Sequence, residues 1–212
     1  MKRGLLAVLS GVAMAGVMVG AALAEPVEER AARKMLFSPK GLVLEPVAVE
    51  GLSGEIAASI DALVAQFADR KRLNALEAAG YSYYGALAVP TDRVLEMENL
   101  AFVTKLHNPE AAQATALDAC AGASGSQSCA VVALLLPKNW KPQPLMLSQV
   151  ATERLRKTWK EGEGPKVLAM SPGTEAWVIA KGAGAAEAAL DRCNTRAAEQ
   201  GATDCEIVVS ED

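Results

Sequence analysis

Four cysteines and one histidine are the side chains of this 212-residue sequence with the widest chemical range. A thiolate beside an imidazole can act as a nucleophile, cysteine and histidine can hold zinc, and two cysteines can form a disulfide. The cysteines lie in two pairs, Cys120 with Cys129 and Cys193 with Cys205. Neither pair has the C-x-x-C spacing of redox-active thiols, and a single histidine cannot form a multi-histidine metal site. Disulfide formation is therefore the leading role for these cysteines, with three pairings open.

His107 would have to serve any catalytic triad in the chain. It directly precedes a predicted helix cap at Asn108, and we expect a surface loop residue there. The segment 122–126 fails the G-x-S-x-G pattern at its last position, and the glycines at 182, 184 and 201 match no phosphate-binding or dinucleotide-binding pattern. We therefore predict no catalytic residues, no cofactor and no metal site.

The first 24 residues predict an export signal. Lys2 and Arg3 precede an apolar run from Leu5 to Leu23, and the small residue Ala24 stands before the polar start at Glu25. We expect cleavage after Ala24 and a periplasmic or secreted protein, with an uncleaved membrane anchor as the alternative. An oxidising compartment favours disulfides over zinc.

The remaining 188 residues are mildly acidic, with 19 basic and 25 acidic side chains and a net charge of −6. This balance argues against broad nucleic-acid binding, which needs a basic surface. A chain of this length can bury a core within a single compact body.

An internal repeat is the strongest pattern in the sequence. Residues 116–120 (ALDAC) return as residues 189–193 (ALDRC), and in both places a second cysteine and an apolar run follow. Upstream, residues 85–90 resemble residues 166–172. Agreement of three segments in the same order predicts two copies of one unit, 80–137 and 164–212.

Each copy is predicted to form a β-β-α-β unit, giving an α+β fold with mainly antiparallel sheet. Asn108 and Pro109 suit the start of the helix in the first copy, and Ala186, Ala189, Leu190 and Cys193 share one face of the second helix. The expected strands cover 83–89, part of 100–106 and 130–136 in the first copy, and 167–170, 176–180 and 206–209 in the second; the expected helices run from 108 to 120 and from 185 to 197.

The repeat also selects the disulfide pairing. If the two copies are equivalent, each closes its own loop, which gives Cys120–Cys129 and Cys193–Cys205. We expect each bridge to join the C-terminal part of a helix to the following strand.

Two further segments complete the chain. In the N-terminal segment 25–79 we predict a strand over 42–49 that Pro46 interrupts, a helix starting near Ser53, and an extension or second helix over 69–77. The connector 138–163 is rich in proline and then predicts a helix from about 148 to 159. Its basic side chains suggest an anion, membrane-surface or partner contact, with a solvated helix face as the alternative. These side chains are Arg154, Arg156, Lys157 and Lys160.

Other polar and aromatic residues allow two interpretations each. Asp118 and Asp191 hold matching positions in the two copies. They could act as a catalytic pair, but we expect both to be surface residues of their helices. The larger aromatic side chains could line a ligand groove or pack in the hydrophobic core, and we expect most of them to pack in the core. They are Tyr81, Tyr83, Tyr84, Trp140, Trp159 and Trp177.

The repeated segments 84–89, 116–120 and 129–132 resemble small secreted bacterial proteins of the uncharacterised family DUF4189. With segments 37–41 and 137–140 included, the chain is similar to exported bacterial proteins often labelled 5-aminolevulinate synthase. That label implies pyridoxal-phosphate chemistry, which the export signal and the 188 remaining residues do not favour. The resemblance implies no established catalytic residues.

The sequence therefore predicts a non-catalytic binding module of the cell envelope, whose partner is an envelope protein, a peptide or a polymer. The main alternative is an envelope hydrolase that uses carboxylates at the seam between the copies. A third possibility is an inhibitor or lectin-like module, which would expose an aromatic patch or a projecting loop.

Overall fold

The computed structural model describes residues 25–212, so the predicted export signal lies outside the described residues. This part of the chain folds into two four-stranded, mostly antiparallel sheets and six α-helices. The predicted α+β class is confirmed. Between residues 25 and 212, no helix has the length and apolar character needed to cross a bilayer.

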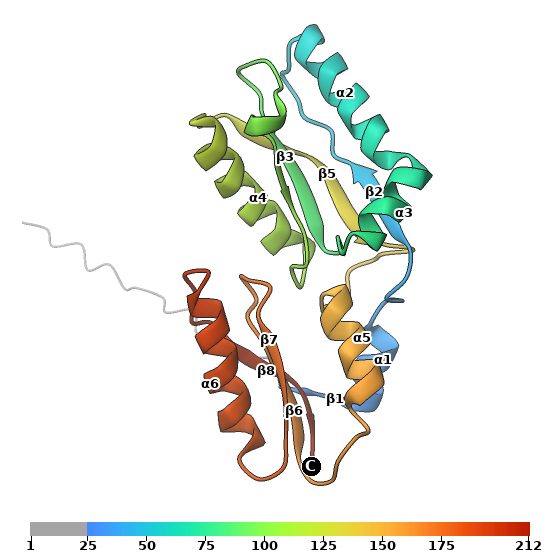
Figure 1. Ribbon diagram of the computed structural model, residues 1–212, viewed down its shortest axis with the longest axis vertical. Helices are drawn as coiled ribbons and strands as arrows, with labels where there is room; N and C mark the ends of the chain where they lie inside the picture. Colours follow the sequence, from blue (N-terminus) through green and yellow to red (C-terminus); the bar gives the residue numbers. More distant parts are fainter. Residues whose placement is uncertain (1–24) are drawn as a thin grey trace, which may run out of the picture.

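The first sheet has the strand order β2-β5-β3-β4, and every neighbouring pair is antiparallel. Helix α4 covers one face of this sheet, and helices α2 and α3 cover the other (Figure 1). The 3-10 helix η1 precedes β4. The bounds are β2 Leu42–Pro46, α2 Gly54–Ala68, α3 Arg70–Ala78, β3 Gly85–Pro90, η1 Met97–Asn99, β4 Ala101–Val103, α4 Pro109–Ser124 and β5 Cys129–Pro137.

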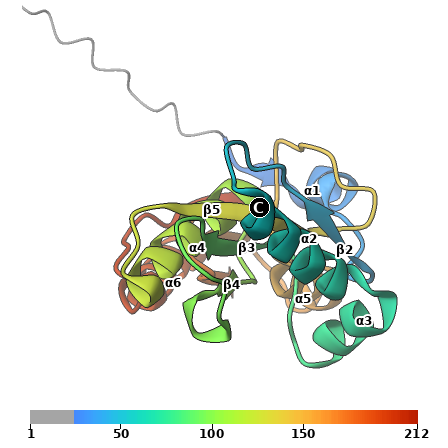
Figure 2. The ribbon, with the colours of Figure 1, turned by 90° about the horizontal axis from the view of Figure 1, so that it is seen from above.

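The second sheet has the order β1-β8-β6-β7, in which the short β1 is parallel to β8 and the other pairs are antiparallel. Helix α6 covers one face of this sheet, and α1 with α5 covers the other. The two halves of the molecule lie end to end (Figure 1), so that one covers much of the other when the molecule is seen from above (Figure 2). The bounds are β1 Val27–Glu28, α1 Glu29–Met35, α5 Gln149–Thr158, β6 Lys166–Met170, β7 Trp177–Lys181, α6 Ala185–Ala198 and β8 Glu206–Glu211.

The two sheets share details of strand register. Leu87 of β3 lies opposite Phe102 of β4, and Leu168 of β6 lies opposite Ile179 of β7. The pairing of β3 with β5 shifts register directly after Leu87, and the pairing of β6 with β8 shifts directly after Leu168. Each shift leaves one extra residue on the last strand of its half, which is a β-bulge.

Small residues let the helices lie close to the sheets. Asn108 caps α4 by accepting from the Ala111 N–H at 2.7 Å, and Ala112, Ala116 and Cys120 are buried at steps of four. In α6 the buried face is Ala185, Ala189, Cys193 and Ala197. The expected place of Ala186 on this face is wrong: Ala186 is exposed, and Ala185 takes its position because the helix contacts the sheet through steps of four.

Candidate functional site

The structure contains the disulfides Cys120–Cys129 and Cys193–Cys205. The first joins α4 to the start of β5, and the second joins α6 to the residue before β8. Cys120 and Cys193 are fully buried, and residues 25–212 contain no free cysteine. Two such bridges are compatible with an exported, stabilised protein because they persist in oxidising compartments.

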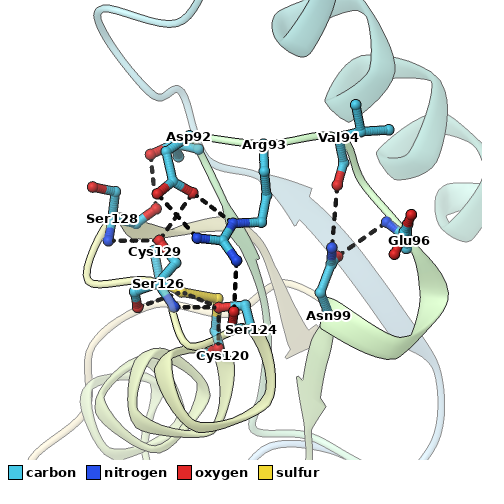
Figure 3. Close-up of a disulfide and its surroundings, with 11 residues drawn as sticks. Asp92, Arg93, Val94, Glu96, Asn99, Cys120, Ser124, Ser126, Ser128 and Cys129 are labelled. Atoms are coloured by element: carbon cyan, nitrogen blue, oxygen red, sulfur yellow. Dashed lines mark hydrogen bonds and ion pairs between the residues drawn. A yellow bond between two sulfur atoms is a disulfide. The ribbon is translucent and has the colours of Figure 1, made fainter.

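A network of polar contacts surrounds the first disulfide (Figure 3). Arg93 donates to the Ser124 carbonyl at 2.6 Å and pairs with Asp92 at 3.0 Å, while the Ser126 hydroxyl donates to Asp92 at 2.9 Å. The hydrogen bonds from Arg93 and then Ser126 lower the pKa of Asp92. These contacts attach the start of the segment 91–99 to the loop that the disulfide closes.

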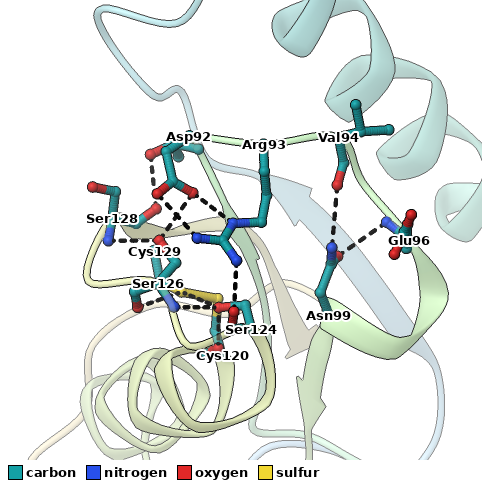
Figure 4. Close-up of polar contacts among 11 residues, drawn as sticks. Asp92, Arg93, Val94, Glu96, Asn99, Cys120, Ser124, Ser126, Ser128 and Cys129 are labelled. Carbon is teal, nitrogen blue, oxygen red and sulfur yellow. Dashed lines mark hydrogen bonds and ion pairs between the residues drawn. A yellow bond between two sulfur atoms is a disulfide. The ribbon is translucent and has the colours of Figure 1, made fainter.

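Asn99 holds the other end of this segment (Figure 4). Its side chain donates to the Val94 carbonyl at 3.1 Å and accepts from the Glu96 N–H at 3.0 Å. The segment 91–99 is thus fixed at both ends, yet it carries Val94 and Met97, which are 77% and 70% exposed. Such a projecting loop is the feature that the inhibitor alternative requires.

His107 is fully buried, so the expected surface position is wrong. Its Nδ1 atom accepts from the Ser148 N–H at 3.1 Å, and the proton is therefore on Nε2, which donates to the Ala176 carbonyl at 3.3 Å. Burial lowers the pKa of His107 to about 4. A neutral imidazole from the first half that binds backbone groups of the second half acts as a structural link, which no local sequence pattern indicated.

The two residues that bind His107, Ser148 and Ala176, also line a pocket between the halves with a volume of about 480 Å³. Its wall draws on the loop after β4, the start of α5, the start of β7 and the end of α6. The first half contributes Lys105 to this concave site, which we call the junction pocket, and α5 with the second half contributes the rest. The lining residues are Lys105, Ser148, Val150, Glu175, Ala176, Trp177, Arg196, Glu199 and Gln200.

The junction pocket combines both signs of charge with an apolar surface. Lys105, Glu175 and Glu199 are exposed, and Trp177 is half-buried. Arg196 donates to the Trp177 carbonyl at 2.8 Å, and the Ser148 hydroxyl accepts from the Ala151 N–H as the cap of α5. These groups can hold a polar ligand of mixed charge against an indole ring.

The four basic residues predicted as a contact differ in their surroundings. Arg156 donates to the Leu36 carbonyl at 3.0 Å and joins α5 to the end of α1, while Lys157 pairs with Glu153 at 2.5 Å. Arg154 and Lys160 are exposed. Arg156 therefore links two helices, whereas the other three side chains lie exposed on the surface, and their role as a contact stays a prediction.

The remaining predicted residues do not gather into one site. Asp118 and Asp191 are exposed helix residues, as expected. Three of the six large aromatic side chains, Tyr83, Tyr84 and Trp159, are buried in the core, and Trp140 packs against it. Tyr81 is exposed, and Trp177 lines the junction pocket. No group of three or more potential metal ligands occurs within the described residues.

The junction pocket could not be found from sequence because its lining comes from four distant segments, none of which carries a motif. The chain matches no family model, no curated protein and no solved structure. Pocket geometry and side-chain chemistry are therefore the basis for a function.

Proposed function

We propose that this chain is an exported, disulfide-stabilised protein that binds a ligand in the junction pocket and performs no reaction on it. Export would follow cleavage after Ala24 and deliver the protein to the periplasm or the exterior. The two disulfides support this location, since they are rare in the reducing cytoplasm. The resemblance to the family DUF4189 remains a prediction alongside it.

The observation that carries the proposal is the lining of the junction pocket. Two cations, two carboxylates and one indole ring surround a volume of about 480 Å³, which is the size of a small-ligand site. A ligand that carries both an amine and a carboxylate, such as a short peptide or the peptide part of an envelope polymer, complements this set. Opposite charges on the ligand would also fix its orientation.

The hydrolase alternative needs two carboxylates in different environments. Glu175 and Glu199 do lie at the seam between the halves, as that alternative expected, but both are exposed. Acid–base catalysis by carboxylates depends on a pKa that burial or a close neighbour has tuned. Binding is therefore the function that this lining favours.

The junction pocket also gives the proposed duplication a role. The pairs Leu87–Phe102 and Leu168–Ile179, together with the matching register shifts, support two copies of a β-β-α-β unit over 80–137 and 164–212. The pocket would then depend on the pair of copies through Lys105, which the first copy adds to a wall that the second copy and the start of α5 otherwise supply.

The proposal is tested by removing one charge of each sign from the pocket. The double variant Lys105→Asn with Glu199→Gln alters two exposed side chains, and asparagine suits the left-handed backbone of Lys105, whose φ is 73°. We expect peptides enriched on the wild-type protein from a random heptapeptide display library to bind this variant about 10- to 100-fold more weakly. Fluorescence anisotropy of the labelled peptides measures the change.

A matched control keeps the same change of charge outside the pocket. Lys141→Asn with Glu163→Gln alters two exposed residues of the connector, and we expect the affinity for the same peptides to stay within about twofold. Equal affinity of the pocket variant and this control would refute the proposal. Hydrolysis of a bound peptide that is lost in Glu175→Gln would establish the enzyme alternative instead.

A further inference from the structure

Strand β7 is the outer strand of its sheet, and its open edge begins at the junction pocket. The sheet order places β6 on one side of β7, and no strand formed by residues 25–212 lies on the other. Trp177, the first residue of β7, lines the pocket. A ligand in the pocket therefore lies next to the start of an open strand edge.

Hydrogen bonds at the two ends of β7 show which backbone groups point outward. The Ala176 carbonyl accepts from the Ser171 N–H at 2.9 Å, and the Gly182 N–H donates to the Pro165 carbonyl at 2.8 Å, so residues with even numbers point toward β6. In an antiparallel strand the direction alternates at every residue. Trp177, Ile179 and Lys181 thus point their N–H and C=O groups away from the sheet. The bond from Arg196 of α6 to the Trp177 carbonyl agrees with this direction.

The other edge strands are less suited to pairing with another chain. Strand β1 has two residues, β4 has three, and β2 ends at Pro46. Natural edges are often protected by short length, proline or an outward lysine. On β7 the ammonium group of Lys181 instead donates to the carbonyls of Thr158 and Glu161, and so it turns back onto the protein.

We propose that the ligand is an extended peptide that adds to β7 as a further strand and continues into the junction pocket. This proposal rests on the proposed function of the pocket. The outward N–H and C=O groups of Ile179 and Lys181, with the N–H of Trp177, bind the peptide backbone, and the pocket selects side chains or a charged terminus. A pocket of about 480 Å³ has room for a few residues of extended chain, whereas a folded second copy cannot enter it.

Two substitutions at Ile179 separate backbone pairing from packing. Ile179→Ala removes the partly buried side chain and keeps the outward N–H, whereas Ile179→Pro removes both. Because this N–H does not bond to β6, proline breaks no hydrogen bond of the sheet at this edge position. We expect the selected heptapeptides to bind Ile179→Ala within about threefold of the wild-type affinity and Ile179→Pro at least about tenfold more weakly.

A modified ligand tests the same contacts on the unaltered protein. Two versions of the selected peptide are made, one with methyl groups on the backbone nitrogens of its odd-numbered residues and one with methyl groups on those of its even-numbered residues. Each version lacks the N–H donors along one edge of the extended peptide, and the version that lacks the donors facing β7 should bind at least about tenfold more weakly. Equal binding of Ile179→Ala and Ile179→Pro, with both methylated peptides unaffected, would overturn strand addition and leave the pocket as a binding site.

Two other outcomes also decide against the inference. If no peptide from the display library binds the wild-type protein more tightly than it binds the variant Lys105→Asn with Glu199→Gln, the proposed function itself fails. If wild-type protein and Ile179→Ala form dimers without peptide in sedimentation experiments and Ile179→Pro does not, the occupant of the edge is a second copy of this chain.

Discussion

Replacing Cys120 and Cys129 together by alanine is expected to lower the free energy of unfolding by about 3 kcal/mol. The bridge closes a loop between residues separated by 9 positions, and opening a loop of this length returns about that much conformational entropy to the unfolded chain. For a chain of this size the loss corresponds to a fall in melting temperature of about 6–12 °C. Urea denaturation monitored by circular dichroism measures the free energy.

The second bridge provides a matched control with a different local effect. Replacing Cys193 and Cys205 by alanine opens a loop between residues separated by 12 positions, so the global loss is again about 3 kcal/mol. Only the first bridge closes the loop whose Ser124 and Ser126 hold Arg93 and Asp92. Amide hydrogen exchange over residues 91–99 should therefore accelerate in the first variant alone, and equal acceleration in both would contradict this coupling.

The sequence predicted those elements whose signals are local. Ser53 and Asn108 each precede a helix start and accept a backbone N–H there, and Ser148 caps α5 in the same way. Pro46 is the last residue of β2, an edge strand, where a proline removes no hydrogen bond of the sheet. The expected α+β class follows from such signals together with the repeated order of segments.

Elements held by tertiary contacts were missed. Strand β1 and helix α1 span two and seven residues, which is too short for a periodic pattern. Helix α1 is fixed by Arg33, which donates to the carbonyls of Leu155 and Arg156 more than 120 positions away. The junction pocket was missed for the same reason, since residues as far apart as Lys105 and Gln200 line it. Of the sequence-based expectations, only the alternative with carboxylates at the seam between the two copies pointed toward the junction pocket.

The fold is expected to lose about 3 kcal/mol of stability through His107 as the pH falls from 6.5 to 4. The unfolded chain binds a proton on this side chain below about pH 6.5, whereas burial holds the pKa of the folded state near 4. Between these values the unfolded state carries more protons, so lower pH favours unfolding. The contribution is fully present above pH 6.5, and a difference of this size in pKa corresponds to about 3 kcal/mol.

The variant His107→Asn isolates this contribution from the carboxylates that titrate in the same range. Its side-chain oxygen can still accept from the Ser148 N–H, while the bond to Ala176 is lost, so we expect a stability about 1–3 kcal/mol below wild type at pH 7. The difference between the two proteins in urea denaturation should shrink as the pH approaches 4, because only the wild type pays for a buried imidazole. If the difference in unfolding free energy between the two proteins stays constant from pH 7 to pH 4, then His107 gains its proton at the same pH in the folded and unfolded states, and the prediction is wrong. In the folded protein His107 gains its proton only near pH 4, where Nδ1 can no longer accept from the Ser148 N–H. Since Ser148 and Ala176 line the junction pocket, ligand affinity should fall near pH 4 rather than near pH 6.5, and more in wild type than in His107→Asn.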